Sequence, residues 1–154
     1  MSSVIETRLK ELGITLPVAA APAANYVPFA QTGKLLLTSG QLPLAEGKLV
    51  HTGLLGRELG VEQGQEAAKA CAVNILAQAK AALGDLEKIA RIVKITVFVA
   101  STPEFTQQHL VANGASDLLV AVLGDIGRHA RSAVGTAALP LNAPVEIEAI
   151  IEVR

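Results

Sequence analysis

The chain has 154 residues, of which 51% are hydrophobic but only 3% aromatic, and its formal net charge is −1 at pH 7. That length predicts one domain, residues 1–154, of the size class that buries roughly 68–70% of its unfolded surface. The near-neutral charge and the scarcity of aromatic residues argue against a nucleic-acid partner, which needs basic patches or stacking platforms.

The number and spacing of cysteines and histidines limit which disulfides and metal sites the chain could form. Cys71 is the only cysteine, which excludes an intrachain disulfide and a cysteine-rich zinc site. The three histidines lack metal-ligand spacing and no glycine-rich stretch fits a nucleotide pattern, so we expect no metal and no cofactor. The N-terminus carries charges throughout and no stretch reaches about 18 uncharged apolar residues, so we expect a cytoplasmic protein with no membrane partner.

The first elements are a short helix and an aperiodic segment. Apolar residues share one face of a helix over 3–12 that Gly13 ends, so residues 1–15 are expected to add a helix and an extended lead-in to the domain. Three prolines in Leu16–Phe29 predict extended chain before a strand. An apolar strand is then predicted over Lys34–Pro43. A glycine-rich loop with room for one short strand follows and extends to residue 60.

A long helix and a strand form the middle of the chain. Apolar residues at three- and four-residue steps predict a helix over Val61–Leu83, ended by Gly84. Alternation predicts a strand over Ile89–Val99, with one face formed by Val93, Ile95, Val97 and Val99.

The last third predicts one more helix and two strands. Thr102 is the expected N-cap of a helix that runs to about Leu123. Strands follow at about Ser132–Leu139 and Val145–Val153. Two long helices can cover only one face of the resulting sheet. On the last strand the other face mixes glutamates with Ile150, which suggests partial burial against another subunit in a C3 or C2 homo-oligomer.

Three motifs in this order, "LLLTSGQLP", "ARSAVG…LP" and "VEIEAI", resemble the RidA (YjgF-type) family, also described as endoribonuclease L-PSP-like. The resemblance covers about residues 29–154. It implies an α/β, chorismate-mutase-like fold: one mixed sheet, two helices on one face, and trimerisation through the other face. It also implies a homotrimer with clefts between subunits and hydrolysis of reactive 2-imino or enamino acids to a 2-keto acid and ammonia.

The resemblance also implies roles for individual residues. Arg131 would bind the carboxylate of a small substrate, a role that suits the planar guanidinium fork. Glu146 would orient and activate the attacking water. Ser39 would bond the reacting end of the substrate, Gly40 would allow close backbone approach, and Asn113 would reach the cleft from the second helix.

Two positions of the implied substrate pocket depart from the family pattern. Phe29 stands where many relatives have tyrosine, and Ala133 stands where many have cysteine. Tyr26 could supply the missing hydroxyl. His129, beside the arginine, could help to bind an anion, but we favour its interpretation as a polar residue at the start of a strand.

The sequence thus favours a 2-imino or enamino acid deaminase. The alternative is a protein that binds small carboxylates such as keto acids without turnover. Ribonuclease activity, which the older family label suggests, fits the composition poorly.

Overall fold

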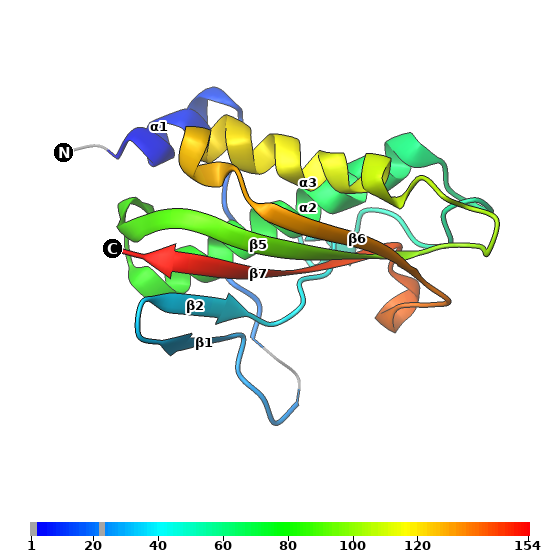
Figure 1. Cartoon of the computed structure of the whole chain (residues 1–154), viewed down its shortest axis with the longest axis horizontal. Coiled ribbons are helices and arrows are strands. Elements are labelled where there is room, and N and C mark those ends of the chain that lie inside the picture. The colour runs from blue at the N-terminus through cyan, green and yellow to red at the C-terminus, as the bar shows by residue number, and fades with distance from the viewer. Residues whose placement is uncertain (1–2, 22–23) are drawn as a thin grey trace.

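The computed structural model describes residues 3–21 and 24–154 and shows an α/β fold with one mixed sheet (Figure 1). The expected domain 1–154 and the expected extended segment thus include four residues, 1, 2, 22 and 23, outside the described part. The helices and strands are α1 (Val4–Glu11), β1 (Phe29–Thr32), β2 (Leu35–Thr38), β3 (Leu44–Ala45), β4 (Lys48–Leu49), α2 (Val61–Leu83), β5 (Ile89–Ala100), α3 (Gln108–Leu123), β6 (Ala130–Thr136) and β7 (Val145–Val153). Three short 3-10 turns complete the order: η1 (Leu86–Lys88), η2 (Gly124–Gly127) and η3 (Pro140–Asn142).

The main sheet has the strand order β1-β2-β7-β5-β6. Only β5 and β6 run parallel, because α3 crosses between them, and the other neighbours are antiparallel. Helices α2 and α3 cover one face of this sheet, as predicted (Figure 1). The odd-numbered residues of β7 are buried on that face. No helix of residues 3–21 and 24–154 covers the opposite face, where Leu35, Leu37 and Val134 are exposed.

Helix α2 begins and ends at the predicted residues, and Gly84 ends it in the left-handed conformation at φ 79°. It packs closely on α3 because glycine replaces a side chain at the contact. A Cβ on Gly114 would collide with the backbone carbonyl of Gln65. This close approach brings the two helices together above the sheet.

The structure differs from the sequence prediction in several details. The strand expected over Lys34–Pro43 is confined to Leu35–Thr38, the loop before α2 holds two short strands instead of one, and the strand expected at about Ser132–Leu139 is Ala130–Thr136. Helix α3 begins at Gln108 and not at Thr102, because the Thr102 amide donates to the Leu55 carbonyl and the chain turns there. In β5 the core contains Ile92, while Val93 is only half-buried. A register shift against β7 between Ile92 and Lys94 breaks the expected alternation.

One segment, residues 108–127, is long and apolar enough to cross a membrane by length and composition alone. Seven of its apolar residues are buried where α3 packs on α2 and the sheet: Val111, Ala112, Ala115, Leu118, Leu119, Val122 and Leu123. That packing is typical of a core helix.

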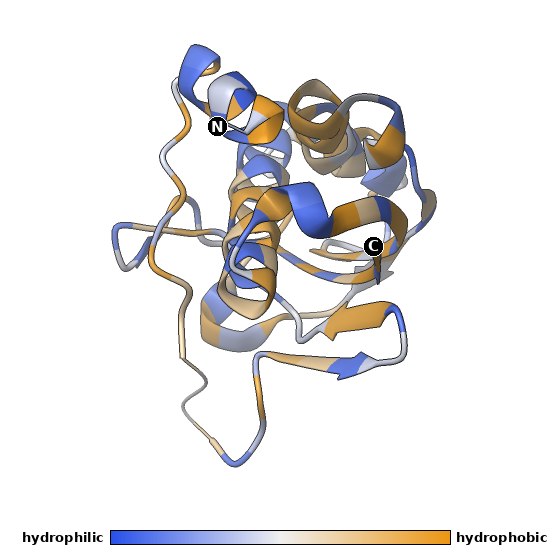
Figure 2. Ribbon diagram, turned by 90° about the vertical axis from the view of Figure 1, so that its left-hand side faces the viewer, coloured by the Kyte–Doolittle hydropathy of each residue, from blue (hydrophilic) through white to orange (hydrophobic). Residues whose placement is uncertain are grey.

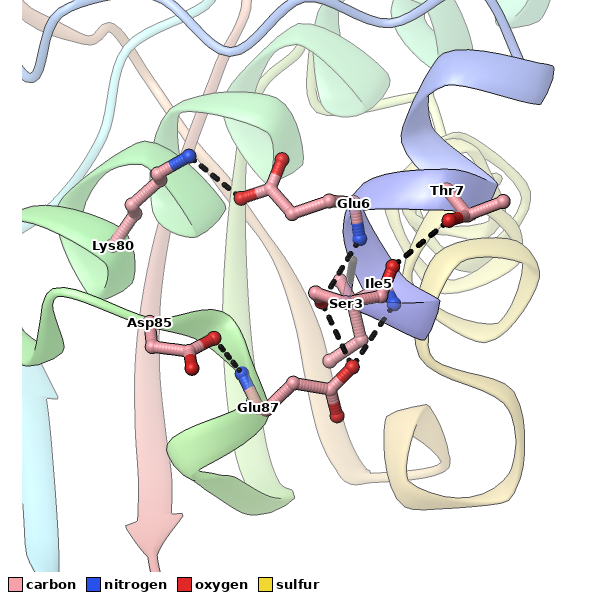
Figure 3. A network of polar contacts seen from close by, with 7 residues as sticks. All are labelled: Ser3, Ile5, Glu6, Thr7, Lys80, Asp85 and Glu87. Carbon is pink, nitrogen blue, oxygen red and sulfur yellow. Dashed lines mark hydrogen bonds and ion pairs between the residues drawn. The ribbon is translucent and has the colours of Figure 1, made fainter. Parts of the chain in front are cut away.

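Helix α1 docks by burying Ile5 and Leu9 in the core and through polar contacts around Glu87, which Figure 3 shows. The Glu87 carboxylate accepts bonds from the Ser3 hydroxyl (2.8 Å) and the Ile5 amide (3.2 Å), so it satisfies donors at the start of the helix. Lys80 of α2 pairs with Glu6 at 2.6 Å. The lead-in segment, residues 14–21 and 24–28, then runs along α2 toward β1 (Figure 2).

Docking of α1 is expected to weaken in acid. The Ser3 hydroxyl and then the Ile5 amide lower the pKa of Glu87, so this contribution to stability is present above the usual glutamate range. It is lost as the pH falls through the lowered folded-state value. Glu87→Ala should speed hydrogen exchange of the α1 amides at pH 7 and remove this pH dependence. The exposed Glu11→Ala should leave exchange unchanged, and equal effects of both variants would contradict the docking role.

Candidate functional site

Strand β6 and helix α3 together hold Arg131. Arg131 pairs with the buried Ile95, so its side chain lies on the helix-covered face of the sheet. Its Nη1 donates to Asn113 Oδ1 at 2.9 Å and to Ser116 Oγ at 3.1 Å, and its Nη2 donates to the His109 carbonyl at 3.3 Å. We call Arg131, Asn113, Ser116 and His129 the arginine cluster.

These bonds leave part of the guanidinium available. Three of its five N–H donors are used, and the remaining two are the Nε donor and one on Nη2. Nε and Nη2 share an edge of the planar group, which is the fork that a carboxylate binds with two parallel bonds. Within the described ranges, no Asp or Glu forms an ion pair with Arg131. The positive charge is therefore open to an external anion.

His129 belongs to this cluster, although the sequence favoured a polar residue at the start of a strand over a role beside Arg131. Its Nδ1 lies 2.7 Å from the Gly127 carbonyl, which can only accept, so Nδ1 carries the proton and Nε2 accepts. Ser116 then donates its hydroxyl proton to Nε2 at 2.9 Å and accepts from Arg131. Burial, and then the charge of Arg131, lower the pKa of His129, which favours this neutral form.

Ser116 was missed at the sequence level. It lies three residues after Asn113 on α3, a spacing that places both side chains on one helical face. The spacing from Asn113 was the available sequence signal for Ser116. It indicates a site residue only together with the position of β6, which places Arg131 beside this face of α3.

A second group of residues surrounds Gly40, where the chain leaves β2. Leu37 pairs with Ile150, and Gln41 bridges to Ile147. The β2 side thus has one residue more than the β7 side, which is a β-bulge. Bulges occur next to active sites, where they redirect side chains. We call Ser39, Gly40 and Glu146 the carboxylate cluster.

Ser39 has a defined donor and acceptor role. Its hydroxyl donates to the Val27 carbonyl at 2.7 Å, and its amide donates to the Pro28 carbonyl at 2.8 Å. Because the hydroxyl proton is used, the oxygen can offer only lone pairs to a ligand. Ser39 is therefore suited to accept a bond from an N–H group or from water.

Glu146 has the environment of a general base. It lies half-buried on the face opposite the helices, two residues from Glu148 on the same strand face. Burial, and then the negative charge of Glu148, raise the pKa of its carboxyl. A raised pKa brings a carboxylate closer to the proton affinity that base catalysis needs near neutral pH.

Gly40 is expected to be irreplaceable beside this carboxylate. A Cβ at position 40 would collide with Glu146 Oε2, so Gly40→Ala should displace the carboxylate while leaving the fold intact. We expect the apparent pKa of Glu146, followed by NMR titration of its carboxyl carbon, to change in this variant. Gly60→Ala is the control, because its φ of −103° suits alanine and the nearest atom to the added Cβ is the side-chain oxygen of Gln63 at 3.3 Å. An unchanged titration in Gly40→Ala would contradict the contact.

The two departures from the family pattern lie near these clusters. Phe29 pairs with Thr38 and packs its ring against the hydrophobic core. Tyr26 is 58% exposed and lines a cavity that Ser39 and Gly40 also line. Ala133 lies two residues after Arg131 on the same face of β6 and packs on the core.

One chain does not bring the two clusters together. Glu146 pairs with Phe98, and Phe98 pairs with Val134, so Glu146 lies two strands from β6. Arg131 lies three residues from Val134 and points to the opposite face. Strand spacing and rise separate the two backbone positions by roughly 14 Å. A site that uses both clusters on one small molecule therefore needs a second chain.

The described residues contain no group of three His, Cys, Asp or Glu side chains placed to hold a metal ion. The chemistry that the two clusters can perform is anion binding, proton transfer and hydrogen bonding.

Comparison with known proteins identifies relatives over the whole chain. Residues 6–152 match the family described as "YjgF/chorismate mutase-like, putative endoribonuclease". Protein TCP17 of Trypanosoma cruzi is 52% identical over 99% of this chain and 96% of its own length. A crystal structure of a protein of unknown function from Agrobacterium tumefaciens is 63% identical, with a TM-score of 0.93 over 98% of this chain and 93% of that one. E. coli TdcF, solved with bound serine, is 26% identical, with a TM-score of 0.64 over 89% and 94%.

Proposed function

The chain belongs to the YjgF/chorismate mutase-like family, and from this membership and the two clusters we propose that it hydrolyses 2-imino and enamino acids to 2-keto acids and ammonia. The observation that carries the proposal is Arg131. Its guanidinium is held by three groups of α3, has no acidic partner among residues 3–21 and 24–154, and keeps a two-donor edge free. Such a group binds a carboxylate, which every 2-imino acid carries.

The carboxylate cluster supplies the hydrolytic step. The substrate reacts as its iminium ion. Glu146 takes a proton from water as the water oxygen bonds to C2, and the C=N π electrons move to nitrogen. The protonated Glu146 then returns this proton to the nitrogen, which becomes an ammonium leaving group. The C–N bond breaks to release ammonia as the hydroxyl oxygen forms the C=O bond, and the hydroxyl proton passes to the ammonia to give ammonium. Ser39 accepts a hydrogen bond from the iminium N–H, because its own hydroxyl proton is donated to the Val27 carbonyl and only its lone pairs remain. An enamino acid enters as its imine tautomer.

Two chains would form each site. C2 of the substrate is bonded directly to its carboxylate carbon, so Arg131 and Glu146 must converge on neighbouring atoms. Their positions on opposite faces of one sheet exclude this within a chain. We propose a homotrimer in which the open sheet face meets neighbouring subunits and each cleft combines one arginine cluster with one carboxylate cluster. Serine in E. coli TdcF carries the same carboxylate beside a nitrogen-bearing carbon, which supports a ligand of this class.

The test is the rate of ammonia release from 2-imino acids generated in situ by an amino acid oxidase with catalase present. The wild-type chain should accelerate release above the rate in buffer. No acceleration with retained binding of 2-keto acids would replace this proposal with the binding-protein alternative. Cleavage of RNA by the purified chain that Arg131→Ala abolishes would instead favour a ribonuclease.

A mixing experiment tests the shared cleft. Arg131→Ala and Glu146→Gln chains should each be inactive alone, but unfolded and refolded together in equal amounts they should recover about a quarter of the sites, because a heterologous ring pairs intact clusters at that frequency. Light scattering on the same samples measures the oligomeric state. A monomer, or a mixture without recovery despite assembly, would contradict the shared site.

A further inference from the structure

The Gly127 carbonyl is fixed where η2 joins α3 to β6. A Cβ on Gly127 would collide with the Leu119 carbonyl of α3, so only glycine lets the turn pack this close to the helix. Gly127 is buried, and a hydrogen bond of 3.1 Å from the Arg128 amide to the Asp125 carbonyl closes the turn. The backbones of two elements thus determine where this carbonyl lies.

This carbonyl selects one tautomer of His129. It lies 2.7 Å from Nδ1 and can only accept a hydrogen bond, so the ring proton is on Nδ1. Nε2 keeps its lone pair and lies 2.9 Å from the Ser116 hydroxyl oxygen. The opposite tautomer would bring two acceptors together at Nδ1 and leave both without a proton. The backbone of η2 therefore decides which ring nitrogen accepts.

The tautomer of His129 in turn sets the direction of the Ser116 hydroxyl. A hydroxyl has one proton to donate and two lone pairs with which to accept. Nε2 accepts the proton, so the lone pairs remain for Arg131, whose Nη1 donates to Ser116 Oγ at 3.1 Å. With the proton on Nε2, the hydroxyl would accept from the ring, and its own proton could turn toward a guanidinium that has only donors. The observed tautomer excludes that repulsive contact.

Ser116 completes the set of acceptors that hold Arg131. Asn113 Oδ1 takes the second Nη1 proton at 2.9 Å, and the His109 carbonyl takes one Nη2 proton at 3.3 Å. With Nη1 fully used on α3, the edge formed by Nε and Nη2 is the one left for a carboxylate. A long arginine side chain loses conformational freedom when it binds a ligand, and a guanidinium that is already held loses less. The bond to Ser116 therefore contributes to affinity without touching the ligand.

We propose that His129 is a positioning residue for carboxylate binding: through the Ser116 hydroxyl, it holds the Arg131 guanidinium in the orientation that receives the substrate. His129 contacts no substrate atom in this arrangement, and its effect passes entirely through Ser116. The inference rests on the carboxylate-binding role of Arg131 in the proposed function. It does not depend on the hydrolytic step, because it concerns affinity and not chemistry.

The first test is a double-mutant cycle on the binding of pyruvate, a simple 2-keto acid, measured by calorimetry with the full chain. His129→Phe keeps a planar ring but removes both nitrogens, and Ser116→Ala removes the hydroxyl. Each should raise the Kd for pyruvate roughly tenfold, the effect of one lost hydrogen bond. Because His129 acts through Ser116, the double variant should bind as weakly as Ser116→Ala alone. Losses that multiply would overturn the inference.

A kinetic comparison separates positioning from a general loss of structure. In His129→Phe, the KM for 2-imino acids should rise about as much as the Kd for pyruvate, with kcat retained. His129→Gln offers an amide oxygen as the acceptor for Ser116 and should bind pyruvate nearly as well as wild type. His51→Phe is the matched control, because His51 lies outside the arginine cluster and pairs with Glu66 of α2. Equal losses in His129→Gln and His129→Phe, or an equal loss in the control, would contradict the positioning role.

A measurement on the unmodified chain applies even if a variant fails to fold. Nitrogen-15 NMR of the histidine rings at pH 7 should show His129 protonated on Nδ1 and unprotonated on Nε2, with and without pyruvate. The reverse tautomer, or a ring that exchanges between the two, would overturn the inference, because Ser116 would then not be held as an acceptor for Arg131.

The outcomes distinguish this inference from the proposed function. If the wild-type chain binds no 2-keto acid, or Arg131→Ala binds pyruvate as well as wild type, the carboxylate role of Arg131 fails and this inference fails with it. If Arg131→Ala loses binding while His129→Phe keeps it, only this inference fails. If the cycle is non-additive but no 2-imino acid is hydrolysed faster than in buffer, the proposed hydrolysis fails and this inference stands.

Discussion

Arg131→Lys is expected to lower kcat/KM for 2-imino acids by roughly 10²–10³, the consequence of losing about 3–4 kcal/mol from a desolvated charge pair. Lysine keeps the positive charge, but a single ammonium cannot replace three bonds to α3 and the two-donor fork toward the substrate. The loss should appear largely as weaker binding of 2-keto acids in calorimetry. Activity at the wild-type level would contradict bidentate binding of the carboxylate.

Arg128→Lys is the matched control for this result. Arg128 lies three residues earlier, its side chain is 76% exposed, and its contact with Asp125 spans 3.7 Å. An ion pair of that kind contributes little, so the variant should keep wild-type kinetics. Ser116→Ala should give an intermediate loss, because it removes one of the two bonds at Nη1 and leaves Asn113 in place.

Glu146→Gln is expected to lower kcat by roughly 10²–10⁴, the usual contribution of a positioned general base. Glutamine keeps the size of the side chain but cannot accept the water proton, so binding of 2-keto acids should change little. A higher KM and weaker binding of 2-keto acids, with kcat unchanged, would instead assign Glu146 to substrate binding. Stability at pH 7 should not fall, because a carboxyl whose folded-state pKa is raised opposes folding once it is ionised.

The pH profile gives a second readout of the same residue. Because burial and Glu148 raise the pKa of Glu146, the active base is present above that raised value. Activity should therefore decline at a higher pH than for an ordinary glutamate as the solution is acidified. Glu148→Gln removes the like charge, lowers the pKa of Glu146 and should move the acid limb to lower pH with kcat at the plateau retained. An acid limb that does not move would show that the charge of Glu148 does not raise the pKa of Glu146.

Several elements were accessible from the sequence because their cause is local. The helix over Val61–Leu83 and its end at Gly84 follow from apolar spacing and the conformational freedom of glycine. The strand over Val145–Val153 shows the predicted alternation, with buried residues at the odd positions and half-buried or exposed residues between them. Three motifs at matching separations identified the family. The roles of Ser39, Gly40, Asn113, Arg131 and Glu146 remain predictions that the experiments above would test.

The remaining features depend on contacts between distant segments, which no local pattern encodes. The amide of Thr102 bonds to Leu55, and this bond delays the helix to Gln108. The bulge at Gly40 follows from pairing with β7, more than a hundred residues away. Ser116 and His129 join Arg131 only because α3 packs along β6. Periodicity thus predicted the main helices and strands, and the resemblance of three motifs identified the family. Tertiary packing alone decided which donors of Arg131 stay free and on which face Glu146 lies, because both depend on where separate strands and helices meet.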